Sequence, residues 1–229
     1  MAVVLPKNTI FLHVPKTGGE WIQAYLQKQN LIVYRLVGHA DARTAAFYFD
    51  RLYRRSLSGI LKEIAWRLRF PKRQAPSEAP FLFSFVRHPL RWYESMFKYS
   101  RGRGWPWHGD RNYSPVSSGA LSWLNGIQHD SFMDYMKEIL DKRPGFLTDL
   151  YAEYTGPQLG FVGRTENLML DLEKVFKKRK LTYDSNLLGS LPRKNVSAGQ
   201  VLTWDEGIRR EVIETELPIF RRHAYDPDE

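Results

Sequence analysis

The stretch Ile10-Phe-Leu-His-Val-Pro-Lys-Thr-Gly-Gly-Glu-Trp-Ile22 is the most informative part of this chain. Its apolar first half is typical of a buried strand, residues 15–19 form a proline- and glycine-containing turn, and an amphipathic helical pattern follows. Such a turn directs several backbone N–H groups toward one point, with the positive end of the helix dipole behind them. Because Lys16 adds a full positive charge, the stretch predicts a binding site for a phosphate-like anion.

The order of residues in this turn differs from that of the common nucleotide-binding loop, G-x-x-x-x-G-K-[ST]. In that loop the lysine follows the last glycine, and the next residue is a hydroxyl that holds magnesium. Here Lys16 precedes Gly18 and Gly19, and Glu20 and Trp21 follow them. A P-loop kinase or NTPase, which would share the fold, is therefore an alternative that the spacing disfavours.

Length and composition predict one globular domain over residues 1–229. Of these residues 43% are hydrophobic and 14% aromatic, which excludes a disordered chain. The chain has no cysteine, which excludes disulfides, thiolate metal ligands and a thiolate nucleophile. We find no room for a signal peptide and no run of about 18 to 20 apolar residues, so we expect a cytoplasmic protein.

The chain is basic, with a net charge of +9 from 34 Lys+Arg against 25 Asp+Glu. This balance favours an anionic partner: a nucleotide, an acidic glycan, a nucleic acid or an anionic membrane. The segment Leu57–Phe70 has apolar residues at helical spacing and basic residues away from that stripe. We interpret it as a helix docked on the sheet, with an acceptor-binding or membrane-surface helix as the alternative.

Three apolar runs, Thr9–Val14, Phe81–Val86 and Leu159–Val162, are each followed by a turn and a helical pattern. Strands that alternate with helices predict an α/β fold with a parallel sheet covered on both faces. We expect a further strand near Leu31–Val37. Near the end of the chain, Thr203-Trp-Asp-Glu206 predicts a capping box that opens a helix through residue 217, ended or kinked by the proline at 218.

The second apolar strand leads into a further group of anion-binding residues. Pro89 suits the first turn of a helix, which places Arg87 at the end of the strand and Ser95 about two turns into the helix. Because ligands of parallel α/β sheets bind beyond the carboxyl ends of the strands, Arg87 and Lys16 should face one edge. Arginine offers phosphate a planar, charge-assisted fork that a serine hydroxyl can complete. A structural salt bridge of Arg87 is the alternative.

These motifs resemble those of the sulfotransferases that use 3′-phosphoadenosine 5′-phosphosulfate (PAPS), closest to the carbohydrate and glycosaminoglycan O-sulfotransferases and their bacterial relatives. The run HVPKTGG is similar to the family's 5′-phosphosulfate loop, and the R-x-P…S arrangement from Arg87 to Ser95 to its 3′-phosphate segment. Phe161-Val-Gly-Arg164-Thr-Glu-Asn167 is similar to its third strand-to-helix turn, and Leu191-Pro-Arg-Lys-Asn195-Val-Ser197 to the loop that closes over the nucleotide.

The resemblance covers nearly the whole chain and implies a P-loop-type three-layer sandwich, with a central parallel sheet flanked by helices. It also implies sulfuryl transfer from PAPS to an acceptor hydroxyl, with 3′,5′-adenosine bisphosphate (PAP) as the product and without a metal. Lys16 would neutralise the leaving oxygen between sulfur and phosphorus. The residues expected to bind the nucleotide are Lys16, Thr17, Gly18, Gly19, Glu20, Trp21, Arg87, Ser95, Arg164, Asn195 and Ser197.

The chain departs from the family pattern at two places. The family often has Thr-Ser where this chain has Glu20-Trp21. That change keeps the backbone donors but loses a hydroxyl contact to the 5′-phosphate. Many relatives have an arginine five residues after the position of Arg87, where this chain has Trp92. Arg91 is one residue early, so we leave it out of the site.

The acceptor hydroxyl must lose a proton as it attacks, which calls for a general base with a pKa near neutrality. We expect His39 to be this base, because it follows the expected strand near residue 37 at the same edge of the sheet. A Gly-His pair there also resembles the bacterial relatives. The alternatives are His108, Glu94 and a purely structural role for His39.

Residues 101–119 are rich in glycine, tryptophan and arginine, and a loop of this length is typical of a functional lid or an insertion. We expect a substrate-side loop in which Trp105, Trp107 and His108 contact a hydroxylated glycan or glycolipid, with or without acidic groups. Small phenols, peptidyl tyrosine and lipids stay open as acceptors, as does a membrane contact. A non-enzymatic alternative is a basic module that binds nucleic acid or membrane through this segment.

Overall fold

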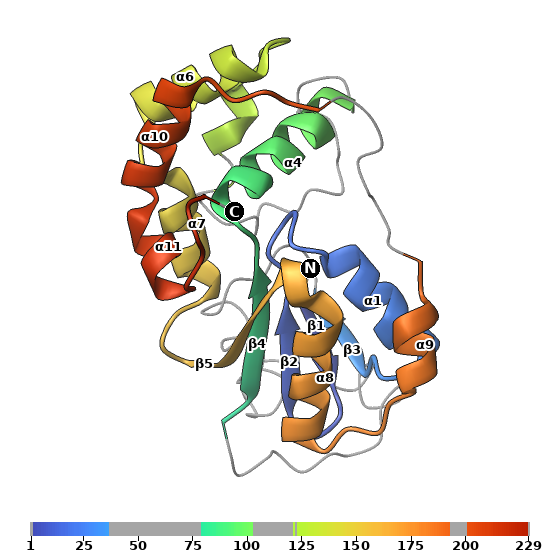
Figure 1. The fold of residues 1–229 in the computed structure, drawn as a ribbon. Coiled ribbons are helices and arrows are strands. Elements are labelled where there is room, and N and C mark those ends of the chain that lie inside the picture. The colour runs from blue at the N-terminus through green and yellow to red at the C-terminus, as the bar shows by residue number, and fades with distance from the viewer. Residues whose placement is uncertain (1, 37–78, 103–120, 122, 193–200, 229) are drawn as a thin grey trace, which may run out of the picture.

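A computed structural model of the chain describes residues 2–36, 79–102, 121, 123–192 and 201–228 (Figure 1). At its centre lies a five-stranded mixed sheet with the strand order β3-β1-β2-β4-β5. The strands are β1 (Ala2–Leu5), β2 (Thr9–Leu12), β3 (Tyr34–Leu36), β4 (Phe81–Val86) and β5 (Leu159–Arg164).

The three apolar runs that the sequence predicts as parallel strands are neighbours in the sheet. β2 runs parallel to β4, and β4 runs parallel to β5. The chain turns from their carboxyl ends into α1 (Gly19–Lys28), α4 (Pro89–Gly102) and, through a short 3₁₀ helix, α8 (Leu168–Arg179). This confirms the α/β class and brings three strand-to-helix turns to one edge of the sheet.

The expectation of a wholly parallel sheet is wrong at β1, which lies between β2 and β3 and is antiparallel to both. Lys7 and Asn8 both have positive φ, 54° and 53°, in the tight turn that joins β1 to β2. The loop has three residues, since Leu5 pairs with Thr9, and left-handed backbone within it lets the chain reverse direction between the two strands. The short apolar run at the start of the chain therefore folds back as a hairpin.

The strand expected near residues 31–37 is present as β3. Ala2 of β1 pairs with Leu12 of β2 on one side and with Leu36 of β3 on the other. Because β1 is antiparallel to both neighbours, β3 runs in the same direction as β2. The end of β3 therefore lies at the same edge as the end of β2, about two strand spacings, or ~10 Å, away.

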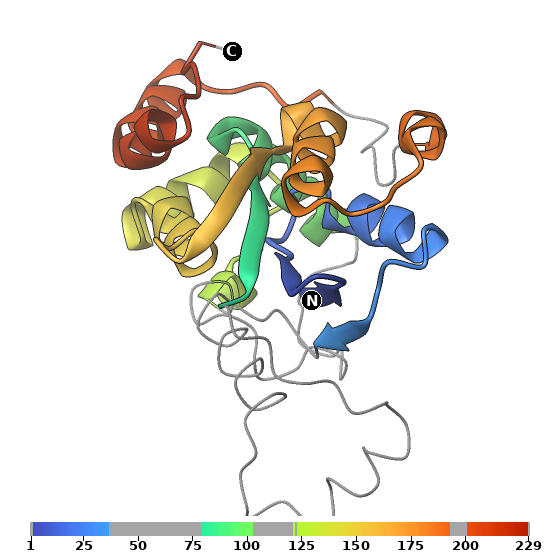
Figure 2. The same ribbon diagram turned by 90° about the horizontal axis from the view of Figure 1, so that it is seen from below.

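Side chains that alternate along the strands fill one hydrophobic core on each face of the sheet, as pleated backbone dictates. On one face Phe11, Phe83 and Phe85 pack with residues of α1, α8 and α9 (Ser185–Ser190). On the other face the core is shared with α4, α6 (Phe132–Lys142), α7 (Phe146–Tyr154), α10 (Glu206–Thr215) and α11 (Leu217–Arg222). Figure 2 shows these helices in layers on either side of the sheet.

The last predicted helix is present, but its start and its end differ from the prediction. Asp205 is the N-cap of α10 in place of Thr203, since its carboxylate accepts hydrogen bonds from the amides of Gly207 and Ile208. The helix ends at residue 215, and α11 begins two residues later with Pro218 in its first turn. A proline is tolerated there because the first amides of a helix have no partner within it. In the part of the chain that the structure describes, no helix combines the length and the apolar character needed to cross a membrane.

Candidate functional site

The turn between β2 and α1 is shaped by left-handed backbone at two residues. The angle φ is 65° at Lys16 and 79° at Gly18, which is the N-cap of α1. A Cβ on Gly18 would lie 2.9 Å from Leu168, and one on Gly19 would lie 1.9 Å from the ring of His13. The turn therefore requires both glycines, and positive φ at a lysine is the kind of backbone strain that clusters at ligand sites.

The N-terminus of α1 has no side-chain cap, because its N-cap is glycine. The first amides of a helix lack partners within the helix and form a natural anion site with the dipole behind them. The side chains of Thr17 and Trp21 donate hydrogen bonds to backbone carbonyls of the protein. The hydroxyl of Thr17 donates to the carbonyl of Val14 at 2.8 Å, and the indole of Trp21 donates to the carbonyl of Leu191 at 3.2 Å. Contacts of these residues with a ligand would therefore come from their backbone.

Arg87 follows β4 directly and reaches across to this turn. Its Nη1 donates a hydrogen bond to the backbone carbonyl of Lys16, with a distance of 3.4 Å. The hydroxyl of Tyr151 fixes the backbone of Arg87, since it accepts from the N–H and donates to the carbonyl, both at 3.0 Å. Burial lowers the pKa of Arg87, and the nearby carboxylate of Glu166 opposes that shift. The two predicted anion-binding segments are thus adjacent.

One face of α4 lies along the same turn. Trp92, Ser95 and Tyr99 are spaced three and four residues apart, so they share one side of the helix. The indole of Trp92 donates to the carbonyl of Pro15 at 2.9 Å, and the ammonium of Lys16 lies 3.9 Å from the ring centroid of Tyr99. Ser95 lies between these two contacts along the helix and is 8% exposed. The geometry therefore brings Lys16, Arg87 and Ser95 to one place.

Trp92 is a residue of the site that the sequence alone did not identify. The sequence shows that it replaces an arginine of the resembling family, but not that its wholly buried ring ties α4 to the β2–α1 turn. The sequence feature that could have indicated it is its place three residues before Ser95, on the same helix face. An indole has a single N–H donor, which is enough for one backbone carbonyl.

The third strand-to-helix turn lies where the sequence predicts it, but the side chain of Arg164 is directed toward the segment after α11. Its Nη2 donates to the carbonyl of Ala224 at 3.0 Å, and its guanidinium lies 5.0 Å from the ring centroid of Tyr225. The carboxylate of Glu166 accepts from the amide of His88 at 2.9 Å and from the hydroxyl of Tyr225 at 3.0 Å. This turn therefore joins the end of β4 to the last described segment.

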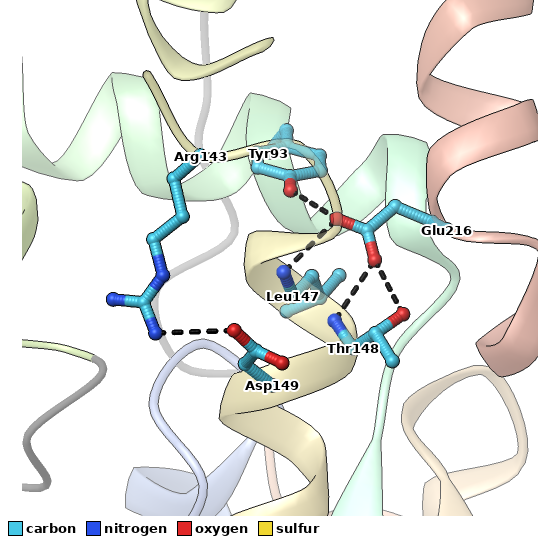
Figure 3. Close-up of polar contacts among 6 residues, drawn as sticks. All are labelled: Tyr93, Arg143, Leu147, Thr148, Asp149 and Glu216. Carbon is cyan, nitrogen blue, oxygen red and sulfur yellow. Dashed lines mark hydrogen bonds and ion pairs between the residues drawn. The ribbon is translucent and has the colours of Figure 1, made fainter. Parts of the chain in front are cut away.

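A buried carboxylate occupies another helix N-terminus, at α7. Glu216 is 1% exposed and accepts hydrogen bonds from the amides of Leu147 and Thr148 and from the hydroxyls of Thr148 and Tyr93, at 2.5–2.9 Å (Figure 3). Burial raises the pKa of Glu216, and these hydrogen bonds oppose the shift. The ion pair of Arg143 and Asp149 beside it is shown in the same view. This cluster joins α7, α4 and the start of α11.

Several predicted residues lie outside the described residues, so their roles stay predictions. Glu94, an alternative base, is described: its Oε1 accepts from the indole of Trp204 at 2.9 Å, and its Oε2 lies 3.8 Å from Arg91. These contacts engage the carboxylate in packing and make it a poorer candidate. The predicted residues that lie outside the described part are His39, Trp105, Trp107, His108, Asn195 and Ser197. The segment Leu57–Phe70 also lies outside it.

Comparison of this chain with protein-family models, with curated proteins and with solved structures found no match. The motifs and the geometry of the β2–α1 turn, Arg87 and the adjoining face of α4 are therefore the basis on which a function can be inferred.

Proposed function

We propose that this protein is a PAPS-dependent sulfotransferase with a P-loop-type fold, which transfers a sulfuryl group to an acceptor hydroxyl on a carbohydrate or glycolipid. The observation that carries the proposal is the hydrogen bond from Arg87 to the carbonyl of Lys16, 3.4 Å long. A nucleotide with phosphate groups at both ends needs two anion sites at one edge of a sheet. This contact joins the two segments that supply them.

Sulfuryl transfer, like phosphoryl transfer, depends on in-line positioning and on stabilisation of charge at the leaving oxygen. The 5′-phosphosulfate would lie at the N-terminus of α1, and Arg87 with Ser95 would hold the 3′-phosphate. The acceptor oxygen would bond to sulfur as the bond from sulfur to the bridging oxygen breaks. Lys16 would stabilise the charge on that leaving oxygen, and His39 would accept the proton of the acceptor hydroxyl.

The acceptor side of the proposal rests on the segment that includes Trp105, Trp107 and His108. Aromatic rings offer stacking surfaces to sugars, and the net charge of +9 suits an acceptor that already carries acidic groups. Action in the cytoplasm is part of the same proposal.

The proposal is tested by incubating the protein with PAPS labelled in its sulfuryl group and with a panel of glycans, glycolipids and phenols. We expect sulfated products, detected by mass, from at least one class of hydroxylated acceptor. His39→Ala should abolish turnover while PAP binding persists. Near-normal turnover in that variant would show that another residue is the base.

Calorimetry distinguishes the proposed enzyme from the two alternatives. We expect PAP to bind more tightly than ATP–Mg²⁺, whereas the reverse order would indicate a kinase or NTPase. RNA binding with a steep dependence on salt, together with no affinity for PAP, would indicate a basic nucleic-acid-binding module.

A further inference from the structure

We infer that Tyr99 is a positioning residue for Lys16, an inference that rests on the proposed function. The ammonium of Lys16 lies 3.9 Å from the centroid of the Tyr99 ring. Cation–π attraction acts within about 6 Å of a ring centroid. The contact joins the lysine of the β2–α1 turn to the second site segment, because Tyr99 belongs to α4.

The lysine of such a site needs an orienting partner that leaves its charge intact. A lysine side chain has a flexible four-carbon stem, and it starts here from an unusual backbone with φ of 65°. A carboxylate partner would neutralise the ammonium and compete with the incoming anion. An aromatic ring attracts the cation through its quadrupole and leaves the charge of the ammonium unchanged.

The ring of Tyr99 is itself held in place. It is partly buried and packs against the hydrophobic core on its face of the sheet. Two turns earlier on the same helix face, Trp92 ties α4 to the carbonyl of Pro15 at 2.9 Å. The neighbouring carboxylate of α4, Glu94, is engaged by Trp204 and Arg91. The packing of the ring and the hydrogen bond of Trp92 therefore hold Tyr99 beside the β2–α1 turn.

The position of Tyr99 also suits the proposed transfer. Ser95 precedes it by four residues, and side chains at this spacing are neighbours about 5–6 Å apart on a helix. The ring therefore holds the ammonium about one helical turn from the residue proposed to bind the 3′-phosphate. The same lysine belongs to the turn that precedes α1, where the 5′-phosphosulfate of the donor is proposed to lie.

The test compares Tyr99→Leu, which removes the ring, with Tyr99→Phe, which keeps it. We expect Tyr99→Leu to lower kcat about tenfold, in line with the loss of one cation–π contact, with KM for PAPS within about twofold of wild type. Tyr99→Phe should keep wild-type kcat. Wild-type kcat in Tyr99→Leu would overturn the inference, and so would an equal loss in both variants, because the hydroxyl would then be the functional group.

The matched control is Phe81→Leu. Phe81 lies at the opposite end of β4, where Lys178 and Arg179 lie 5.3 and 5.1 Å from its ring centroid. This variant also removes a cation–π contact, and we expect it to leave kcat unchanged. A loss equal to that of Tyr99→Leu would show that general loosening of the fold, and not the position of Lys16, lowers the rate, which would overturn the inference.

A second readout separates failure of this inference from failure of the proposed function. Lysines labelled by reductive ¹³C-methylation keep their charge, and the Lys16 signal is identified by its loss in Lys16→Arg. Without any ligand, we expect ring-current shifts of this signal in wild type and Tyr99→Phe, and their loss in Tyr99→Leu. An unshifted signal in wild type would refute the contact itself. If the signal is shifted but the protein transfers no sulfuryl group, the contact between Lys16 and Tyr99 stands. The proposed function, and with it the role of Tyr99 in transfer, would then be refuted.

Discussion

Among the described helices, α1 and α7 both begin after a glycine with left-handed backbone, and different side chains adjoin their N-termini. The φ angle is 79° at Gly18 and 74° at Gly145, and neither helix has a side-chain cap from its N-cap residue. At α7 the buried carboxylate of Glu216 bonds the first amides. At α1 the adjoining side chains include the cations Lys16 and Arg87.

The two helices therefore begin in the same way and differ in the charged groups beside their first turns. At α7 the anion is part of the chain, so the terminus is closed and contributes to stability. At α1 a cation and a second positive side chain adjoin the terminus, which suits an anion that arrives from outside. Substitutions at the two termini can test whether α1 belongs to function and α7 to stability.

The largest effect is expected from removing the charge at α1. Lys16→Ala should lower turnover by about 10²–10³-fold, the usual cost of losing a donor that stabilises developing charge. PAP affinity should change much less, because PAP lacks the sulfuryl group and its bridging oxygen. Steady-state kinetics with labelled PAPS measures the first quantity, and calorimetry measures the second. Lys28→Ala, at the exposed far end of the same helix, is the control. Comparable turnover in the two variants would refute the role of Lys16.

The next effect concerns the anion at α7. Glu216→Gln turns an amide NH₂ toward N–H or O–H donors, and we expect it to lower the free energy of unfolding by about 2–3 kcal/mol. Urea denaturation measures this loss, while PAP affinity should not change. Glu214→Gln, at an exposed position of α10, should be neutral in both measurements. Weaker PAP binding in Glu216→Gln at a temperature where it is folded would break the division of roles between the helices.

The same substitution at the two N-cap glycines compares the two helix termini directly. Gly18→Ala and Gly145→Ala each place a Cβ on a left-handed backbone, so each should lower the free energy of unfolding by about 1–2 kcal/mol. Only Gly18→Ala should also weaken PAP binding, since that turn would carry the 5′-phosphate. Thermal unfolding with and without PAP measures both quantities. Equal stabilisation of the two variants by PAP would contradict the assignment of the anion site to α1.

An effect of similar size is a pH dependence on the Arg87 side. Burial, with Arg222 and Arg164 nearby, lowers the pKa of His223 from 6.5 to about 4, and its ring contacts Tyr151, which fixes Arg87. The unfolded chain therefore binds a proton that the folded chain excludes between these pH values. Stability should fall by about 1–2 kcal/mol from pH 6.5 to 4, less than the full shift because the ring is partly exposed.

This dependence is measured by urea denaturation across the same pH range. His223→Asn should flatten the part of the profile that His223 contributes, because asparagine does not titrate. An unchanged slope in the variant would show that other groups carry the pH dependence.

The sequence predicted those parts of the molecule that depend on neighbouring residues. The strand–turn–helix pattern around Lys16 and around Arg87 is local, so the edge at which both residues lie followed from the parallel strands. The requirement for Gly18 and Gly19 could be predicted because the turn that needs them is also local. The sequence does not predict the hairpin of β1. Its four residues are all apolar, so they show no alternation that would identify a separate strand before β2.

Contacts between distant residues could not be predicted in this way. Glu216 binds an amide 69 residues earlier in the chain, and no spacing around it indicates a buried carboxylate. Asp205 and Thr203 are both good N-cap residues, so the local pattern did not decide between them. The direction of the Arg164 side chain depends on Tyr225, which becomes a neighbour only through the packing of α11.

The most direct test of the proposed pair of anion sites is a calorimetric cycle with two ligands and two variants. PAP and adenosine 5′-monophosphate differ by the 3′-phosphate, and Arg87→Gln and the exposed Arg91→Gln differ by the arginine that is removed. We expect Arg87→Gln to weaken PAP binding at least about tenfold and adenosine 5′-monophosphate hardly at all, with Arg91→Gln like wild type. Equal losses for both ligands, or equal losses in both variants, would contradict a 3′-phosphate site at Arg87 beside the Lys16 turn.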